Sequence, residues 1–312
     1  MRLTVIGCSG SFPSSSSPAS CYMLSATGAE GKVWRILVDM GNGALGAVQQ
    51  HVNLADIDAI LISHLHPDHC IDLSGVYVAI KWDPRGWPRG PLPLYGPSDI
   101  HQYLLNTHGL TMQTGMQTEF DFRYWKPGQS VEIGPFKVRP FEVVHPVKEP
   151  YALRIECESI NGKTVLAYSG DTDACPGLLA AAQDADLFLC EAAYQEGRDD
   201  HLRGIHLTGR RAAQTAQQAH VRNLMLTHLP VWNDPEEVKA EAAAVFDGGI
   251  GLAEPGATYL VHPRPENRGR GTDPATTTLR AIKRQAFSTY SMDTGTGNDQ
   301  LEGKDRADGS RS

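Results

Sequence analysis

The sequence has few cysteines, and none of them form a CxxC pair. This scatter argues against a disulfide framework, and it suits a reducing compartment. We therefore expect a cytoplasmic protein whose thiols are free. The cysteines are Cys8, Cys21, Cys70, Cys157, Cys175 and Cys190.

The sequence also lacks a membrane-spanning segment and an excess of basic residues. No apolar run approaches the roughly 18 residues that would indicate a span. The formal net charge is -8, whereas a general nucleic-acid binder needs a basic stripe to neutralise phosphates. We therefore expect no membrane association and no strong nucleic-acid binding. A small anionic nucleotide is still compatible with this charge, because bound metal ions can supply local positive charge.

The chain changes character after His262, where Pro, Gly, Thr, Ser and mixed charges replace the alternation of apolar and helical segments. We predict one α/β domain over residues 1–262 and a mostly disordered tail over residues 263–312, with a short helix at 279–287. The order of elements favours two sheets with helices outside. The predicted strands include 2–7, 33–39, 59–63, 136–144, 164–169, 187–190 and 224–227, and the predicted helices include 44–52, 71–81, 209–219 and 235–246.

The strongest chemical signal is the sequence His-Leu-His-Pro-Asp-His at residues 64–69. It brings the candidate ligands His64, His66, Asp68 and His69 together directly after an apolar predicted strand. In open α/β sheets, ligand sites lie at the carboxyl ends of strands. Imidazole with carboxylate suits zinc, manganese or iron, and the lack of cysteine in this segment argues against a structural zinc site.

Four residues cannot fill the coordination shells of two metal ions. Three further candidates each follow a predicted strand, namely His145, Asp171 and His228. A single His or Asp at a strand end is more often a cap or a solvated group than a ligand. Three such residues together with residues 64–69 favour one joint site.

These residues resemble the metal-binding motifs of the metallo-β-lactamase superfamily, over about residues 1 to 262. The HxHxDH motif of that superfamily corresponds to residues 64–69. The resemblance implies an α/β fold, the four-layer αββα metallo-β-lactamase sandwich, and two divalent ions, zinc first with manganese or iron as alternatives. The ligand sets that it implies are His64, His66 and His145 for one ion, Asp68, His69 and His228 for the other, and Asp171 as the bridge.

Within that superfamily the chain resembles the ribonuclease Z-like branch. The similarity lies in Gly7-Cys8-Ser9-Gly10-Ser11, in residues 37–43 and in Tyr95-Gly96-Pro97. It implies that Glu191 and His206 act as a pair near the scissile phosphate. His206 would protonate the leaving oxygen or stabilise its charge, with Glu191 orienting the ring. The plainer alternatives are a surface histidine and a buried structural carboxylate.

The tRNA enzymes of this branch carry a long arm between the elements equivalent to His145 and Asp171. Here these residues are only 26 apart, which leaves room for two strands and a turn. In this respect the chain resembles the actinobacterial cyclic-nucleotide phosphodiesterases of the branch, called atypical class II. We therefore predict a binuclear metal-dependent phosphodiesterase that converts cyclic AMP to its 5′-monophosphate, with Asp68 holding the nucleophile or accepting its proton.

Three alternatives compete with this prediction. A tRNA 3′-processing ribonuclease and a thioester or lactone hydrolase would both use the same scaffold. The Glu191 and His206 pair counts against the thioester or lactone reaction. A non-catalytic binding protein is the third alternative, and the intact set of candidate ligands counts against it.

Two further features carry weaker hypotheses. Asp39 is a candidate carboxylate behind a ligating histidine, with a turn-stabilising role as the alternative. The loop that holds Trp82, Arg85 and Trp87 could stack a base and meet a phosphate. The same loop could instead be a plain lid or a homodimer contact. Cys70 is expected to be a small buried residue.

Overall fold

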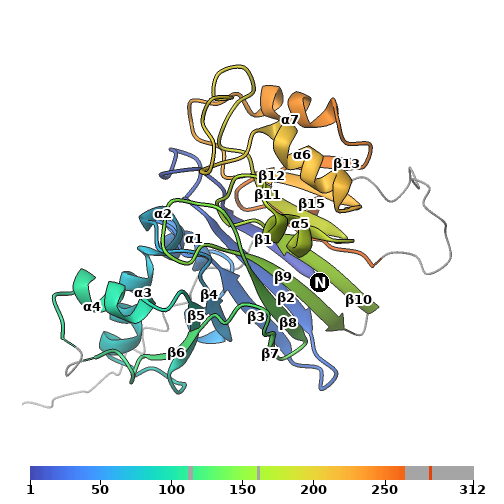
Figure 1. Cartoon of the computed structure of the whole chain (residues 1–312). Helices are drawn as coiled ribbons and strands as arrows, with labels where there is room; N and C mark the ends of the chain where they lie inside the picture. The colour runs from blue at the N-terminus through green and yellow to red at the C-terminus, as the bar shows by residue number, and fades with distance from the viewer. Residues whose placement is uncertain (112–114, 160–161, 264–280, 283–312) are drawn as a thin grey trace, which may run out of the picture.

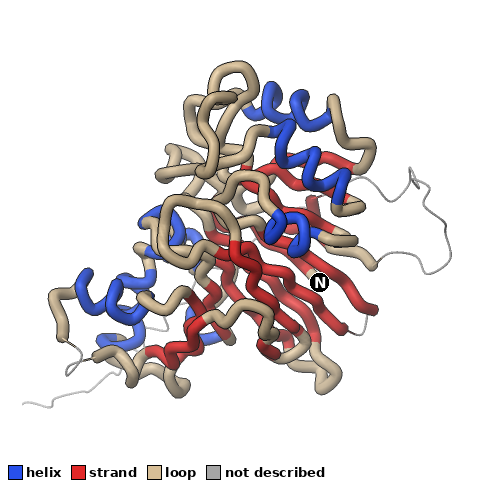
Figure 2. Tube along the Cα trace, in the orientation of Figure 1, coloured by secondary structure: helices blue, strands red, loops and turns tan. Residues whose placement is uncertain are grey.

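A computed structural model describes residues 1–111, 115–159, 162–263 and 281–282 of the chain. Its strands form two sheets that face each other, and helices cover the outer surface of each sheet (Figure 1). Figure 2 shows the same arrangement, with the strands in the middle of the molecule and the helices outside. The predicted four-layer αββα sandwich is confirmed.

The first sheet has the strand order β15-β14-β1-β2-β3-β4-β5-β6. Strands β3 to β6 are parallel to one another, so their carboxyl ends lie at one edge of the sheet. Polar residues that follow β3 and β4 therefore meet at that edge. The strands are β1 (Arg2–Gly7), β2 (Cys21–Thr27), β3 (Val33–Val38), β4 (Ala59–Leu61), β5 (Leu92–Gly96), β6 (Phe120–Tyr124), β14 (Thr258–Leu260) and β15 (Ala281–Ile282).

The second sheet has the strand order β13-β12-β11-β10-β9-β8-β7. Strands β10 to β13 are parallel. Strand β8 is antiparallel to β9, which is antiparallel to β10, so β8 points the same way as the parallel strands. The strands are β7 (Val131–Ile133), β8 (Phe136–Glu142), β9 (Tyr151–Ser159), β10 (Gly162–Tyr168), β11 (Leu187–Glu191), β12 (Asn223–Thr227) and β13 (Gly249–Leu252).

The helices in the first part of the chain lie on the first sheet, and the helices in the later part lie on the second sheet (Figure 1). The Thr208 side chain caps α6 by accepting a hydrogen bond from the backbone N–H of Arg211 at 3.2 Å. None of the helices in the described residues is long and apolar enough to cross a membrane. The helical elements are α1 (Ala44–Val48), η1 (Leu54–Asp56), α2 (Pro67–Cys70), α3 (Leu73–Trp82), α4 (Ile100–Thr107), α5 (Pro176–Ala182), α6 (Gly209–Gln218) and α7 (Pro235–Ala243).

Three hydrophobic clusters fill the spaces between the four layers. One lies between the sheets and includes Leu24 and Leu153. A second joins the first sheet to its helices through residues such as Ile60 and Leu73, and a third, which includes Phe188, does the same for the second sheet. Each such buried side chain contributes about 1.5–3 kcal/mol relative to exposure. The sheets are therefore fixed against each other, and so are the loops at their shared edge.

The structure corrects one prediction for the tail. Ala281 and Ile282 form β15, which pairs antiparallel with Tyr259 and Thr258 of β14. The helix predicted at 279–287 is therefore wrong at these two residues. The physical reason is that β14 would otherwise expose the unpaired N–H and C=O groups of an edge strand. Residues 264–280 and 283–312, for which disorder was predicted, lie outside the described residues.

Candidate metal centre

The HxHxDH segment turns from strand to helix within a few residues. The buried strand β4 ends at Leu61, and His64 follows it. His66 is the N-cap of the short helix α2, and Pro67 occupies its first turn. Proline fits there because its missing N–H would have no partner in the helix. This tight turn gathers the side chains of residues 64–69 at the edge where β4 ends.

The first group of candidate ligands consists of three histidines and one aspartate. Nδ1 of His66 lies 3.2 Å from Nε2 of His64 and 3.0 Å from Nε2 of His145. Oδ2 of Asp171 lies 3.8 Å from the same nitrogen of His64. One ligand atom from each of these residues lies within 4.8 Å of all the others. The structure thus brings together the residues predicted for one metal ion.

The second group consists of Asp68, His69, Asp171 and His228, which meet the same 4.8 Å criterion. Nε2 of His69 and Nε2 of His228 each lie 3.2 Å from a carboxylate oxygen of Asp171. Oδ2 of Asp68 lies 3.6 Å and 3.7 Å from the same two nitrogens. Asp171 belongs to both groups, which is the arrangement that the implied bridging role would require.

Gly170 explains how Asp171 reaches this position. Its φ of 56° is in the left-handed region, which glycine adopts without strain. A Cβ at residue 170 would lie only 2.6 Å from the carbonyl oxygen of Tyr151 and 3.2 Å from Cβ of Ser63. The close approach of the two sheets at this point therefore requires glycine, and it delivers Asp171 into the space between the histidines.

Three ligand atoms in this centre are buried without a hydrogen-bond partner in the described part of the chain, namely Nε2 of His69, Nε2 of His228 and Oδ1 of Asp171. Each unsatisfied buried polar atom costs about 1–3 kcal/mol. A cation between these atoms would remove that cost. Imidazole nitrogens and carboxylate oxygens suit zinc, manganese and iron. The residues therefore fit a pair of divalent ions.

The electrostatics of the histidines also suit metal binding. Burial lowers the pKa of four of them, so that their rings are neutral and keep a lone pair for a ligand at neutral pH. His69 differs, because the carboxylates of Asp171 and Asp39 outweigh burial and raise its pKa. The four histidines with lowered pKa are His64, His66, His145 and His228.

Asp39 lies directly behind the second group. Its carboxylate accepts hydrogen bonds from the backbone N–H of Ser63 at 2.7 Å and from the hydroxyl of Tyr168 at 2.7 Å. It also lies 2.8 Å from Nδ1 of His69. Asp39 has a φ of 60°, a conformation that is uncommon outside glycine and concentrates at functional sites. The residue ties the ends of β3, β4 and β10 to one metal-ligand candidate.

Two other histidines have supporting partners that the sequence did not indicate. Nδ1 of His145 lies 2.8 Å from the carbonyl oxygen of Ile205. Nδ1 of His228 lies 2.9 Å from Oγ of Ser20. In both cases the partner engages one ring nitrogen and leaves the other facing the centre, as ligating histidines require. No local pattern marks Ser20 or Ile205, because each partner is distant in the sequence.

Glu191 and His206 form the predicted pair. Nδ1 of His206 lies 2.9 Å from Oε1 of Glu191, and the backbone N–H groups of Thr172 and Ala193 donate to the same carboxylate at 2.9 and 3.0 Å. Burial alone would lower the pKa of His206, but the charge of Glu191 more than offsets it and raises the pKa to about 9. The pair stands next to Asp171, which lies 4.0 Å from His206.

The structure does not bring the loop of Trp82, Arg85 and Trp87 to this centre. The loop leads into the amino end of β5, where Arg89 donates to the carbonyl oxygen of Ile57 at 2.8 Å just before β4 begins. Trp87 packs on the core beneath α3. The loop is therefore not brought together with the candidate ligands, because a loop that enters a parallel strand lies at the edge opposite the ligand site.

Cys70 is buried, as predicted, and its thiol donates to the carbonyl oxygen of His66 at 3.2 Å. It belongs to none of the ligand groups among the described residues. Its role there is to pack the short helix α2 against the first sheet.

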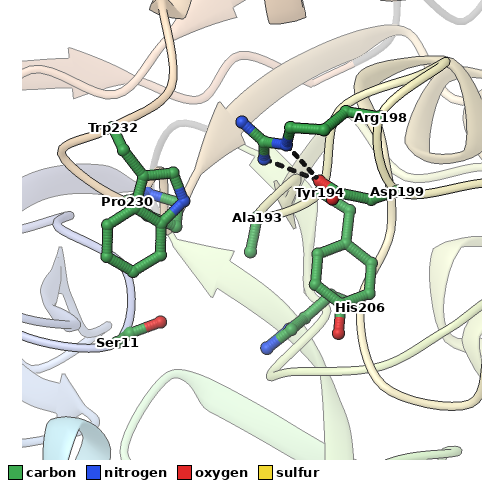
Figure 3. A pocket seen from close by; sticks show the side chains of 8 residues that line it. All are labelled: Ser11, Ala193, Tyr194, Arg198, Asp199, His206, Pro230 and Trp232. Atoms are coloured by element: carbon green, nitrogen blue, oxygen red, sulfur yellow. Dashed lines mark hydrogen bonds and ion pairs between the residues drawn. The ribbon is translucent and has the colours of Figure 1, made fainter. Parts of the chain in front are cut away.

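A pocket opens at His206, and its other lining residues were not predicted from the sequence (Figure 3). The pocket has a volume of about 510 Å³. The available signal was the position of Trp232, only four residues after His228 in a loop that follows a predicted strand. The residues that line it are Ser11, Ala193, Tyr194, Arg198, Asp199, His206, Pro230 and Trp232.

Comparisons with known proteins agree with this geometry. A family model described as "Beta-lactamase superfamily domain" matches residues 34–229. The uncharacterized protein ML1173 of Mycobacterium leprae (strain TN) is 39% identical over 264 residues, which cover 83% of this chain and 88% of that protein. The "Probable metallo-hydrolase YhfI" of Bacillus subtilis (strain 168) is 29% identical over 83% of this chain and 99% of its own length.

Solved structures give the same result. The crystal structure of YhfI from Bacillus subtilis matches with a TM-score of 0.70 and 27% identity, over 83% of this chain and 99% of that chain. The short form of human tRNase Z matches in fold, with a TM-score of 0.64 and 20% identity over 84% of this chain and 99% of that chain. The chain therefore belongs to the metallo-β-lactamase superfamily, and it is similar to YhfI and, in fold, to tRNase Z.

Proposed function

We propose that this chain is a binuclear metal-dependent phosphodiesterase that hydrolyses 3′,5′-cyclic nucleotides, cyclic AMP first, to 5′-monophosphates. The observation that carries the proposal is the Glu191 and His206 pair beside Asp171. Hydrolysis of a cyclic phosphodiester must place a proton on a poor leaving group, the 3′ oxygen of the ribose. A histidine held by a carboxylate next to the metal groups is suited to that task.

The residues of the chain divide the work between them. His64, His66 and His145 would hold one ion, and Asp68, His69 and His228 the other, with Asp171 shared. Bound divalent ions supply activation of a water at neutral pH and stabilisation of charge on the phosphate. The chain itself orients the ligands through Asp39, Ser20 and Ile205. His206 presents its second ring nitrogen to the pocket, and Glu191 fixes the direction of that ring.

The room around the centre supports a small substrate rather than precursor tRNA. Most of the segment between His145 and Asp171 is taken up by β9 and β10, which pair with each other in the second sheet. This leaves no length for a protruding arm. The net charge of -8 would also repel a long polyanion. A pocket of about 510 Å³ beside His206 is in the range of small-molecule sites.

A substrate panel tests the proposal. Wild-type protein and Asp68→Ala, each supplied with zinc or manganese, are incubated with cyclic AMP, cyclic GMP, bis(p-nitrophenyl) phosphate, precursor tRNA and a glutathione thioester. We expect wild-type turnover of the cyclic nucleotides and of the synthetic diester, and a large loss in the variant. Cleavage of precursor tRNA without cleavage of a cyclic nucleotide would replace the proposal by ribonuclease Z activity. Turnover of the thioester alone would replace it by thioester hydrolysis.

A further inference from the structure

The pocket beside His206 is built from three loops, and each of them follows the carboxyl end of a strand (Figure 3). Ser11 comes from the loop after β1. Tyr194 and Arg198 come from the loop after β11, and Trp232 comes from the loop after β12. The first and third loops are joined directly, because the N–H of Gly10 donates to the carbonyl oxygen of Leu229 at 3.1 Å. The pocket is therefore part of the same edge that carries the metal centre.

One wall of the pocket is an exposed aromatic surface. The ring of Trp232 lies 5.5 Å from that of Phe12, centroid to centroid, at an angle of 48°. Trp232 is 59% exposed and Phe12 is 40% exposed. Neither belongs to the hydrophobic clusters, so packing of the core does not account for them. Adjacent large apolar groups left in water beside a site indicate a surface that a ligand covers.

The opposite side of the pocket is formed by Tyr194. Figure 3 shows its ring across the cavity from Trp232, with the ring of His206 between them at the base. The rings of Tyr194 and His206 meet edge to face, 5.0 Å apart at 85°. The pocket therefore places two aromatic surfaces around a space that adjoins the proposed proton donor.

Arg198 fixes the width of this space. Its guanidinium donates to the carboxylate of Asp199 at 2.6 Å and to Oδ1 of Asn233 at 2.8 Å. Asn233, which is buried, donates in turn to the carbonyl oxygen of Ala193 at 2.9 Å. The loops after β11 and β12 are thereby held together. Because Asp199 neutralises Arg198, the pocket offers little net charge for a phosphate.

We propose that this pocket is a nucleobase subsite, in which the base of a nucleotide stacks on the indole of Trp232 while its phosphate lies at the metal centre. The proposal rests on the proposed phosphodiesterase function. A base presents a flat, uncharged aromatic face. This matches a pocket that has an aromatic wall and whose charged residues Arg198 and Asp199 pair with each other. Stacking of one base on one aromatic side chain changes affinity roughly 5- to 150-fold. The larger face of a purine stacks more strongly, so the subsite favours purine over pyrimidine nucleotides.

The test compares a substrate that has a base with one that lacks it. Trp232→Ala, Trp232→Phe and wild type are assayed on cyclic AMP and on the 3′,5′-cyclic phosphate of 1-O-methylribose. Trp82→Ala is the matched control, because Trp82 is as exposed but lies at the other edge of the sheet. We expect Trp232→Ala to raise KM for cyclic AMP roughly tenfold or more and to leave the base-free substrate unchanged. Trp232→Phe retains most of the affinity, and Trp82→Ala behaves as wild type.

Binding of adenosine, followed by calorimetry on the metal-loaded protein, separates this proposal from the proposed function because it needs no turnover. We expect Trp232→Ala to weaken adenosine binding by a similar factor. If the wild type binds adenosine through Trp232 but hydrolyses neither cyclic substrate, the phosphodiesterase function is contradicted and the proposed subsite is retained. If the wild type hydrolyses cyclic AMP, and Trp232→Ala is either unchanged or equally impaired on both substrates, the subsite is overturned and the phosphodiesterase function is retained.

Discussion

The carboxylate of Asp39 lies 2.8 Å from Nδ1 of His69 and accepts hydrogen bonds from both the backbone and the hydroxyl of Ser63. It thereby links the end of β3 to the end of β4 and to a metal-ligand candidate. Because a carboxylate can only accept, it places the ring proton on Nδ1. Nε2 of His69 is then free to face the metal groups.

We expect Asp39→Asn to weaken metal binding 10- to 100-fold, on the order found for such supporting carboxylates. The Asn side chain would place an NH₂ group, which can only donate, against groups that now donate hydrogen bonds to the Asp39 carboxylate. Competition with a chelator measures the affinity, and circular dichroism checks the fold. Asp58→Asn is a matched control, since Asp58 is also buried and accepts a hydrogen bond from the backbone N–H of Arg35. Asp58 lies directly before the start of β4, however, whereas Asp39 follows the end of β3. Equal affinity for Asp39→Asn and wild type would refute the role given to Asp39.

His206 and Glu191 are expected to affect the rate and not the metal content. Replacing a proton donor typically costs roughly 10²- to 10⁴-fold, so His206→Ala and Glu191→Gln should lower kcat by that order. The synthetic diester releases p-nitrophenolate, a leaving group that needs no proton. The loss of kcat in these variants should therefore be smaller on this diester than on cyclic AMP. His108→Ala serves as the control, because it changes a histidine that lies at the end of α4 and is hydrogen-bonded to Ser74. A His206→Ala protein with full activity on cyclic AMP would remove the acid role.

Asp173 is expected to position the loop that carries His206. Its carboxylate accepts from Nε of Arg203 at 2.7 Å and from the N–H of Gly204 at 2.8 Å. The next residue, Ile205, supports His145. A small displacement of a catalytic group can cost roughly 100-fold in rate, so Asp173→Ala should lower kcat markedly.

Arg203→Ala distinguishes this role from a general loss of stability. It removes an exposed cation and leaves the bond from Gly204 in place, so its effect on kcat should be much smaller than that of Asp173→Ala. Steady-state kinetics and thermal unfolding of both variants provide the comparison. If the two variants lose activity equally, or only in step with their stability, Asp173 does not act through the loop.

Cys8 provides a prediction of pH dependence. Burial raises the pKa of its thiol to about 11, above the ordinary value of 9.0. As pH rises, the unfolded chain therefore loses this proton before the folded protein does. The contribution of the Cys8 thiol to the free energy of unfolding is complete below about pH 9 and is lost toward pH 11. We expect alkylation of Cys8 by iodoacetamide near pH 8 to be much slower in the native protein than in urea. Mass spectrometry of the labelled peptide gives the rates, and equal rates would contradict the prediction.

The ligand residues could be predicted from the sequence because each lies where a buried strand ends. Apolar segments such as the one before His64 define the strands, and the fold gathers the polar residues that follow them at one edge. The partners behind the ligands could not be predicted in this way. Ser20 and His228 are 208 residues apart, and only the packing of one sheet on the other brings them together.

The choice of Trp82 as a substrate-contact candidate, which the structure places away from the candidate ligands, and the omission of Trp232 have a single cause. Trp82 ends α3 and opens the loop that follows it, and Trp232 lies in a loop; each is two residues from a proline, so composition does not distinguish them. Direction does, because the loop of Trp82 leads into β5 and the loop of Trp232 leaves β12. Loops that leave parallel strands lie at the ligand edge, and loops that enter them lie opposite. Strand direction, which follows from the order of the elements, was the information needed.

Asp171 joins two groups of candidate ligands, and we propose that these groups hold a pair of divalent ions. Elemental analysis of purified wild type and Asp171→Ala, after saturation with zinc and removal of free metal, tests it most directly. We expect two ions for each wild-type chain and at most one for the variant, with both proteins folded. Wild type that retains no transition metal, or a variant that still retains two ions, would contradict it.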